Sequence, residues 1–598
     1  MLKMTHSQKA WPLWALLLSL GYAGCMVPRT ARVFQGIGDD GELVFSSLTG
    51  ALLHPPGFPL FAAINRTLVG AIDLPAYQTL SLLSVVYMSI TSVFLFFICV
   101  RLSRSTLLSA MFVTVFLLFG PTQKSVTLVE VFPFHLLLSS AFIASIVWFN
   151  DTLKLRGLLV ASLLLGCGGA HHPMMILWSP LLLWAIHVRV RDGQSSILTS
   201  TLRCGVFVLI GLSPYVLLFG QYSSAPLLAF GDVRDFEGLL NHALRTDYGT
   251  FQLSAHSSSE VKSYAWDFFG LVLKNSPVWF VGLFMGIRLM RRSEGVQLGS
   301  VLWCVMMLHV GFVFLLRFPE KPSFAILAER FFPCVLFAGI PVLALALLSF
   351  SSLEKRRVLL SLIIVAPSLF MMPENAAASH RRENDFMSAY IEECLHEIPQ
   401  GGVWFTAADF DTFGAQLYHE GRKVRPDVRL LVVPRLGADW YREQLSEQFP
   451  ELKGDVHVWY GESKTRQEFA SKIAAGLMAK GIPVVISPDG NRLPGFEWRP
   501  LGILWQLHSP DQLPPAAETI QTVLVYCARL PDAFVLQDVD LSFHAERLEK
   551  VILPLRETRF ASQGSHPGVA AAFRKSSSHI INGDLGLARS ACERWLRK

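Results

Sequence analysis

The chain has 598 residues, of which 52% are hydrophobic and only 16% are charged, whereas a soluble chain carries about 25% charged residues. This composition excludes a purely cytosolic enzyme. The 52 Lys and Arg residues against 46 Asp and Glu residues give a net charge of +6, too small an excess for a nucleic-acid-binding surface. The nine Cys residues form no C-x-x-C pair, which argues against a zinc or redox site of that kind.

Apolar stretches of nearly membrane-spanning length recur from Trp11 to Met372. Each approaches the roughly 20 residues that a helix needs to cross the hydrocarbon core of a bilayer, so we expect about eleven transmembrane helices. Their expected ranges are 11–27, 78–100, 105–120, 131–149, 157–170, 174–188, 203–220, 276–290, 298–316, 331–350 and 358–372.

Basic residues mark every second junction between these stretches. Lys3 and Lys9 precede the first stretch, and further Lys and Arg residues follow the second, fourth, sixth, eighth and tenth. These residues are Arg101, Arg104, Lys154, Arg156, Arg189, Arg191, Arg288, Arg291, Arg292, Lys355, Arg356 and Arg357. Because basic residues in short loops stay on the cytoplasmic side, the sequence predicts a cytoplasmic N-terminus and an extracytoplasmic C-terminus.

After Met372 the composition becomes that of a soluble domain. The segments "VWFTA", "VRLLVVP", "VHVWY" and "PVVIS" are typical of strands, and polar segments such as "DWYREQLSEQF" between them are typical of helices. We therefore predict a transmembrane domain over residues 1–372 and an extracytoplasmic α/β domain over residues 373–598.

Polar residues that are costly to place in lipid collect at the predicted outer junctions. They come from five separate loops, and their convergence on one face would line a single cavity. The candidates are Asp39, Asp40, Glu42 and His54 in the first loop, Gln123, Lys124, Glu130 and His135 in the second, His171 and His172 in the third, Asp232, Arg245 and Tyr248 in the fourth, and Arg317, Glu320, Lys321, Glu329 and Arg330 in the fifth.

Such a cavity suits a substrate with a phosphate head and a lipid tail. Lys and Arg would bind the phosphate, apolar helices would hold the tail, and a carboxylate would act as general base on a hydroxyl acceptor. No cofactor is indicated with certainty. Asp39, Asp40 and Glu42 could supply hard oxygen ligands to a divalent metal, although three acids within four residues more often mark a polar loop.

Several ordered segments resemble a bacterial membrane family of unknown function that is related to the eukaryotic transmembrane protein O-mannosyltransferase. These segments are "GDDGELVFSSLTGALLHPPGFPLF", "TLVEVFPFH", "GCGGAHHPMM", "GLSPYVLL", "FGDVRDFEGLLNHALRTDYGT", "GGVWFTAADFDTF" and "RPDVRLLVVPRLGADWY". The D-x-G-E and H-P-P-G pair is the most specific part of the set.

The resemblance implies a glycosyltransferase fold of the GT-C class and a sugar donor linked to polyprenyl phosphate. It also implies an acidic catalytic residue in the first outer loop. Matching that loop residue by residue places the catalytic acid on Asp39 and its partner on Glu42, with His54 opening the H-P-P-G turn. Substrate-binding candidates are Lys124, Glu130, His171, His172, Asp232, Arg245, Tyr248 and Arg330 together with His54.

The sequence thus predicts a mainly α-helical, GT-C-like membrane enzyme of the bacterial inner membrane. It would move a sugar from polyprenyl phosphate to a hydroxyl of a protein or an envelope glycan on the periplasmic face. Its expected partners are the lipid-linked sugar, the acceptor and the bilayer. Two alternatives stay open: a transporter or flippase of lipid-linked sugars, which would need alternating access, and a non-catalytic envelope assembly subunit.

Overall fold

A computed structural model describes residues 10–248, 261–284, 297–319, 322–348, 354–382, 385–487, 493–501 and 504–509. Part of the expected helix 276–290 and the residues from 510 onward in the predicted C-terminal domain lie outside the described residues. The chain divides into two compact units. The helical unit comprises Met1–Arg32, Pro55–Gly220 and Asp235–Arg382, and the α/β unit comprises Val33–His54, Gln221–Arg234 and Glu383–Lys598.

The helical unit contains nearly all of the apolar helices. Among the described residues, seven helices are long and apolar enough to cross a membrane, or up to eight if a bent pair counts as one span. They are Trp11–Arg29, Ala76–Ser103, Phe132–Thr152, Pro173–Arg191, Ile197–Ser224, Leu298–Leu315 and Phe324–Ala346, with the bent pair Thr106–Leu118 and Gly120–Val126. The predicted multi-pass, mainly helical membrane fold is therefore confirmed.

Within the described ranges, fewer helices meet this standard of length and hydropathy than the roughly eleven spans expected. Two expected spans fall on α9 (Leu155–His171) and α19 (Glu354–Phe370), which have 17 residues each and are short for a span. The bend between α6 (Thr106–Leu118) and α7 (Gly120–Val126) measures 65°. Phe119 is extended there and Pro121 stands in the first turn of α7, a position that suits Pro because it has no N–H to donate.

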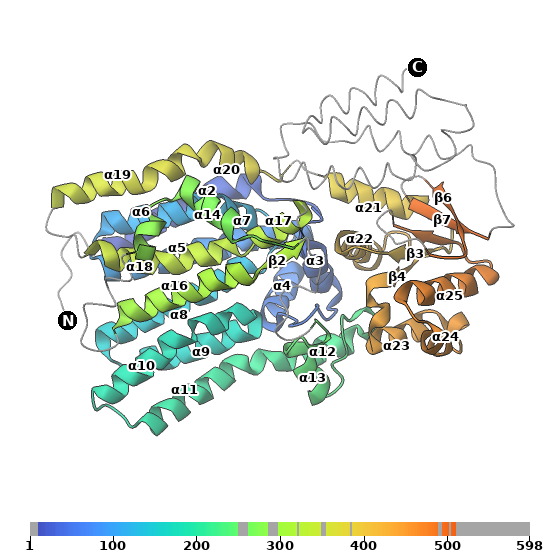
Figure 1. The fold of residues 1–598 in the computed structure, drawn as a ribbon, viewed down its shortest axis with the longest axis horizontal. Helices are drawn as coiled ribbons and strands as arrows, with labels where there is room; N and C mark the ends of the chain where they lie inside the picture. The colour runs from blue at the N-terminus through green and yellow to red at the C-terminus, as the bar shows by residue number, and fades with distance from the viewer. Residues whose placement is uncertain are drawn as a thin grey trace, which may run out of the picture. The chain divides into compact units, whose positions relative to one another are not determined.

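Glycines allow close packing within the bundle. Helices α5 (Ala76–Ser103), α8 (Phe132–Thr152), α9 and α11 (Ile197–Leu212) pack side by side in that order (Figure 1). A Cβ on Gly166 of α9 would lie 2.2 Å from the Val208 carbonyl oxygen of α11, and one on Gly211 would lie 2.3 Å from the Leu163 oxygen. Small residues let two membrane helices approach this closely.

Other helices complete the unit, and a two-stranded antiparallel ribbon joins β1 to β2. These elements are α2 (Trp11–Met26), α4 (Pro59–Ala71), α10 (Ser179–Arg191), α13 (Phe236–Ala243), α14 (Ala265–Asn275), α16 (Leu298–Leu315), α17 (Pro322–Glu329), α18 (Phe332–Leu348), α20 (Met372–Ala378), β1 (Val261–Ser263) and β2 (Arg317–Pro319).

Predicted cytoplasmic junctions from distant parts of the chain contact one another at one end of the helical unit. Arg101, after the second expected span, forms an ion pair with Asp151 at the end of the fourth. Arg189, after the sixth, donates a hydrogen bond to the Leu153 carbonyl over 3.2 Å. The basic junctions that the hydropathy pattern groups together are thus neighbours in space.

The α/β unit is built on a five-stranded sheet with the order β4-β3-β5-β7-β6. The strands are β3 (Val403–Thr406), β4 (Arg429–Val432), β5 (Val484–Ile486), β6 (Glu497–Leu501) and β7 (Leu504–His508). β3 pairs in parallel with β4 and β5, whereas β7 pairs antiparallel with β5 and β6. Since the chain runs from β3 to β4 on one side and then to β5 on the other, the carboxyl end of β3 lies at a topological switch point, where α/β folds bind ligands.

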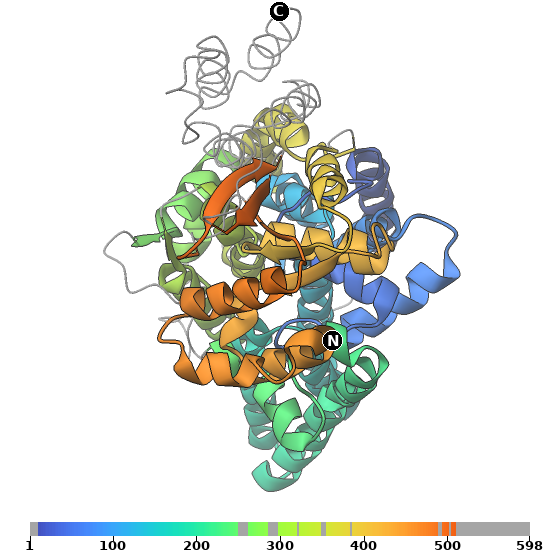
Figure 2. The ribbon, with the colours of Figure 1, turned by 90° about the vertical axis from the view of Figure 1, so that its right-hand side faces the viewer.

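Helices cover both faces of this sheet. α23 (Asp439–Gln448), α24 (Val456–Glu462) and α25 (Arg466–Ala479) share one apolar core with Val403 and Phe405 of β3. Figure 1 shows α21 (Phe386–Glu397) and α22 (Asp409–Ala415) on the other side of the strands, and the orange helices of the first group lie side by side in Figure 2. α22 runs on into η6 (Gln416–Gly421), a π-helical turn.

One predicted strand, "VHVWY", is wrong because it forms helix α24. Its residues alternate as in a strand, yet Val456 is buried while Val458 is 56% exposed. Trp459 instead lies against Gly476 of α25, where a Cβ would come within 2.4 Å of the indole. Packing between the two helices outweighs the β-propensity of Val, Trp and Tyr in this segment.

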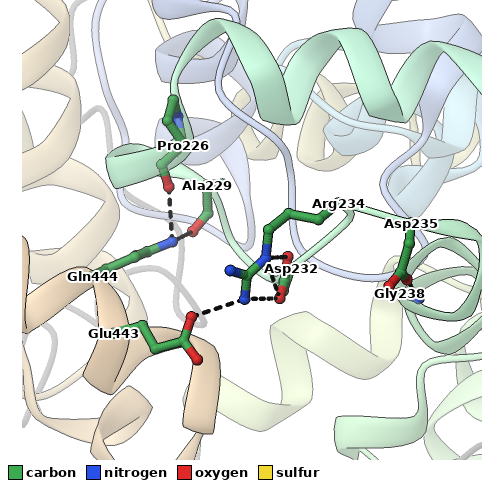
Figure 3. A network of polar contacts seen from close by, with 8 residues as sticks. All are labelled: Pro226, Ala229, Asp232, Arg234, Asp235, Gly238, Glu443 and Gln444. Atoms are coloured by element: carbon green, nitrogen blue, oxygen red, sulfur yellow. Dashed lines mark hydrogen bonds and ion pairs between the residues drawn. The ribbon is translucent and has the colours of Figure 1, made fainter.

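Two segments from within the predicted transmembrane domain belong to the α/β unit. Residues 221–234 lie along α23, where the Gln444 side chain donates hydrogen bonds to the carbonyls of Pro226 and Ala229 over 2.9 and 3.1 Å (Figure 3). The other segment, residues 33–54, contains α3 (Asp40–Thr49), which packs against α22 and η6.

Candidate functional site

The D-x-G-E segment forms the start of α3, and its second acid supports the loop. Asp40 is fully buried. Its Oδ2 accepts a hydrogen bond from the Gln35 backbone over 3.0 Å, and its Oδ1 accepts one from the Gly41 backbone over 2.8 Å. Both carboxylate oxygens therefore hold the backbone that leads into the helix, which gives Asp40 a structural role.

Glu42 of the D-x-G-E segment contacts His54 of the H-P-P-G segment. Its side chain is 3% exposed. Oε1 accepts a hydrogen bond from the His54 backbone over 2.6 Å, and Oε2 lies 2.5 Å from His54 Nδ1. The D-x-G-E helix thereby fixes both the backbone and the imidazole at the start of the H-P-P-G turn.

Asp39 is the N-cap residue of α3, and its backbone carbonyl accepts the first hydrogen bond of the helix from Leu43. Its side chain is half-buried and does not cap the helix. The carboxylate therefore has a different environment from that of Asp40, although the two are neighbours in the chain.

A carboxylate that the sequence analysis missed lies close to these acids. Asp409 follows the carboxyl end of β3 and opens α22. Removal of the carboxyl from water by the surrounding protein raises the pKa of Asp409 above its ordinary range, and the negative charges of Asp39 and Glu42 raise it further. Asp409 could have been predicted from the sequence as an Asp that closely follows a buried parallel strand, because ligands bind at the carboxyl ends of such strands.

An aromatic side chain from residues 221–234 packs beside His54. The Phe230 ring lies 6.0 Å from the His54 ring in an edge-to-face arrangement. The guanidinium carbon of Arg435 stands 3.8 Å from the Phe230 ring centroid, within the range of a cation–π interaction. Three segments far apart in the sequence thus pack in a row, from His54 through Phe230 to Arg435.

Asp232 takes part in the contacts that hold this segment. Arg234 donates hydrogen bonds to both Asp232 oxygens and to Glu443 of α23 (Figure 3). These side chains are largely exposed to solvent, with 56% for Arg234 and 55% for Glu443, so the pairs add little stability.

The helical unit brings together most of the other predicted substrate-binding residues. Lys124 Nζ donates to both Glu329 oxygens over 3.0 Å. Arg330 forms an ion pair with Glu130 over 2.8 Å, and these side chains are 12% and 1% exposed. The second and fifth predicted outer junctions are therefore joined by two charge pairs.

Histidines from the third junction lie beside these pairs. His171 Nε2 is 2.9 Å from the Val131 carbonyl oxygen, and the His172 ring lies 5.4 Å from that of Phe132. His172 is also within electrostatic range of Arg245 and Arg330.

The fourth junction supplies two more of the predicted residues. Arg245 has a positive φ of 58° and its backbone N–H bonds to the His242 carbonyl. Tyr248 ends a 3₁₀ turn over Thr246–Tyr248.

The described residues contain no group of three or more His, Cys, Asp or Glu side chains arranged to hold a metal ion. In the first loop, Asp40 is occupied by two backbone N–H groups and Glu42 by His54. Two of the three acids that could have supplied hard oxygen ligands, Asp40 and Glu42, thus hold the loop through hydrogen bonds.

Comparison with solved structures identifies the class of fold. The chain is similar to ArnT from Cupriavidus metallidurans, solved with undecaprenyl phosphate bound, with a TM-score of 0.51 and 11% identity. The superposition covers 85% of this chain and 99% of ArnT. This likeness confirms the GT-C-like membrane fold predicted from the sequence.

Comparison of sequences identifies the relatives. Residues 39–196 match the Protein O-mannosyl-transferase TMEM260 N-terminal domain family. The chain is 25% identical over 454 residues to Protein O-mannosyl-transferase TMEM260 of Mus musculus, covering 71% of this chain and 63% of the mouse protein. It is 23% identical over 480 residues to the Dictyostelium discoideum protein of the same name, covering 71% of this chain and 57% of that protein. The chain is therefore related to the TMEM260 protein O-mannosyltransferases, as the resemblance predicted, and spans less than two thirds of the length of these two relatives.

Proposed function

We propose that this protein is a glycosyltransferase that moves a sugar from a polyprenyl-phosphate donor to a hydroxyl of a protein or an envelope glycan. The observation that carries the proposal is the first loop, where Asp39 is the N-cap residue of α3 and Glu42 holds His54 by two contacts. The match to the O-mannosyltransferase N-terminal domain begins at Asp39. The undecaprenyl phosphate bound to ArnT supports a lipid phosphate as the carrier.

In the proposed reaction, Asp39 is the general base. It accepts the proton of the acceptor hydroxyl as the hydroxyl oxygen attacks the anomeric carbon of the donor sugar. The bond between that carbon and the phosphate oxygen breaks, and its electron pair leaves with the lipid phosphate. Glu42 and His54 keep the loop in the geometry that orients Asp39.

The basic group of the helical unit is the proposed site for the phosphate of the donor. Arg245 and Arg330 lie within electrostatic range of His172, and Lys124 is paired nearby with Glu329. Arg330 is already paired with Glu130, but a guanidinium has five donors and can bridge a carboxylate and a phosphate. These cations would stabilise the negative charge that develops on the leaving phosphate.

We place the site on the periplasmic face of a bacterial inner membrane. All three segments of the α/β unit fall, in the predicted topology, on the extracytoplasmic side. Contacts such as that of Arg101 with Asp151 gather predicted cytoplasmic junctions, whereas the ion pairs of Lys124 and Arg330 gather predicted outer ones. The fold thus agrees with the alternation of basic residues.

The decisive test is Asp39→Asn, which keeps the size of the side chain but removes the basic oxygen. We expect the rate of mannose transfer from undecaprenyl-phosphate mannose in purified membranes to fall by about 10²–10⁴-fold, with protein level and donor binding unchanged. Asp40→Asn is not a neutral comparison, because both Asp40 oxygens accept backbone hydrogen bonds.

The matched control is Asp73→Asn, an exposed aspartate in the same predicted outer loop. It should transfer sugar at the wild-type rate. Full activity in Asp39→Asn would show that another residue is the base, and an absence of transfer by wild-type protein with this donor would reject mannose as the sugar.

A further inference from the structure

A buried imidazole in the helical unit makes no hydrogen bond to any described residue. His135, in the first turn of α8, is 1% exposed, and both of its ring nitrogens are without a partner among the described residues. A polar group that is removed from water without a hydrogen bond is costly. A ligand that bonds to these nitrogens would remove that cost.

The neighbouring histidines define which atoms such a ligand must offer. His171 Nε2 faces the Val131 carbonyl, which can only accept, so Nε2 carries the proton and Nδ1 is an acceptor. This Nδ1 is buried and has no partner in the described part of the chain. His172 Nδ1 accepts from the Met174 backbone over 3.2 Å, which leaves its Nε2 as a donor.

These three imidazoles form one cluster. The His135 ring centroid lies 6.4 Å from that of His171 and 5.3 Å from that of His172. Burial and the nearby guanidinium groups lower the pKa of His172, which favours its neutral ring. A neutral His135 offers one donor and one acceptor, so the cluster presents acceptors as well as donors.

This pattern distinguishes a sugar from a phosphate. An ionised phosphate offers only acceptor oxygens, so it cannot bond to the acceptor Nδ1 of His171. A hydroxyl both donates and accepts. Aromatic rings also border the cluster, with Phe134 centred 4.9 Å from His171 and Phe58 centred 5.7 Å from it, and an apolar lining with few polar groups is typical of small-molecule sites.

We infer that His135, with His171 and His172, binds hydroxyl groups of the donor sugar, whereas the neighbouring arginines bind its phosphate. The inference rests on the proposed function and adds a sugar-recognition site to it. It predicts that the loss of His135 affects only a lipid that carries a sugar.

The test compares two probes on detergent-solubilised full-length protein, undecaprenyl phosphate and undecaprenyl-phosphate mannose, with binding measured by native mass spectrometry. We expect His135→Phe to weaken binding of the mannosyl lipid by about tenfold or more, the loss of about one hydrogen bond to a buried group. Binding of undecaprenyl phosphate should stay within about twofold of wild type and also reports that the variant is folded.

Two further variants sharpen the result. His135→Gln keeps one donor and one acceptor and should restore part of the mannosyl-lipid affinity. His187→Gln, at an exposed position on α10, should bind both lipids as wild type does.

Equal weakening of both lipids by His135→Phe would overturn the inference, since His135 would then act on the phosphate or on the fold. Unchanged binding of both would overturn it as well, because the cluster would then hold water only. Wild-type protein that binds the two lipids equally well would refute the sugar site alone, whereas wild-type protein that binds neither would also refute the proposed donor.

Discussion

Asp409 is far from the first loop in the sequence, yet its carboxyl is within electrostatic range of the charged side chains of that loop. Its carboxylate makes no hydrogen bond or ion pair with another residue in the described ranges. Its interactions are with the charges of Asp39, Glu42, His54 and Arg435. Two carboxylates that repel each other resist being ionised together, so the protonation of Asp409 should respond to changes at Asp39.

This coupling predicts a measurable shift. Asp39→Asn removes a negative neighbour and should lower the pKa of Asp409, so that its carboxyl loses its proton at a lower pH. Protonated carboxyls react with carbodiimides, and labelling of Asp409 followed by mass spectrometry over a pH series should therefore decline at a lower pH in the variant. Asp73→Asn should leave the midpoint where it is in wild type, and an identical midpoint in Asp39→Asn would disprove the coupling.

At the scale of elements, the glycine of D-x-G-E sets how closely α3 packs against α22. A Cβ on Gly41 would lie 2.7 Å from the Phe34 ring and 3.0 Å from the backbone carbon of Phe413. The ring can shift a little, but the backbone of α22 cannot move without disturbing Asp409 in its first turn. The motif therefore combines a proposed catalytic acid with the packing that positions it.

Gly41→Ala should destabilise the α/β unit by about 1–3 kcal/mol, the usual cost of forcing extra volume into a packed contact. Thermal unfolding of the purified protein, followed by intrinsic fluorescence, measures this loss. Gly461→Ala in α24 is the matched control, since nothing lies within 4 Å of its added Cβ, and Ala in a helix is at least as stable as Gly. Equal melting temperatures for the two variants would contradict the packing argument.

At the scale of the whole molecule, three separate stretches of chain form the α/β unit. Each is predicted to lie outside the membrane, although long apolar segments separate them. Within the helical unit, two ion pairs join junctions that are predicted to lie on the same side of the membrane. Lys124 and Glu329 belong to predicted outer junctions, and Arg101 and Asp151 belong to predicted cytoplasmic ones. The contacts thus pair predicted outer junctions with each other and predicted inner junctions with each other, and the side on which each group lies stays a prediction from the positions of Lys and Arg.

A reporter enzyme that is active only in the periplasm tests that topology. Fused after Gly402, it should give activity, because this position follows an odd number of predicted spans. Fused after Arg191, it should give none, because this junction carries basic residues and is predicted to be cytoplasmic. The reverse pattern would place Asp39 on the cytoplasmic side and exclude the proposed periplasmic reaction.

Some features of the fold and of the candidate site could be predicted from the sequence because they depend on local composition. Hydropathy located most spans, and the D-x-G-E and H-P-P-G motifs marked the loop as a candidate site, although the contact between Glu42 and His54 was not predicted. Other features depend on which distant segments meet. Asp409 and the packing of Phe230 beside His54 depend on the assembly of the α/β unit, and the helical state of α24 depends on α25. The proposed roles of the eleven predicted site residues stay predictions.

The division of the α/β unit among three stretches also affects the order in which the protein can mature. A ribosome makes Val33–His54 long before it makes α22 and η6, against which α3 packs. During that interval the face of α3 around Gly41 has Phe34 beside it but not yet Phe413 of α22, so the loop that carries Asp39 reaches its final geometry late in synthesis. A C-terminal fragment beginning at Glu383 would lack α3 and residues 221–234, so it would expose the apolar surfaces that they cover and would be unsuited to study as an isolated domain.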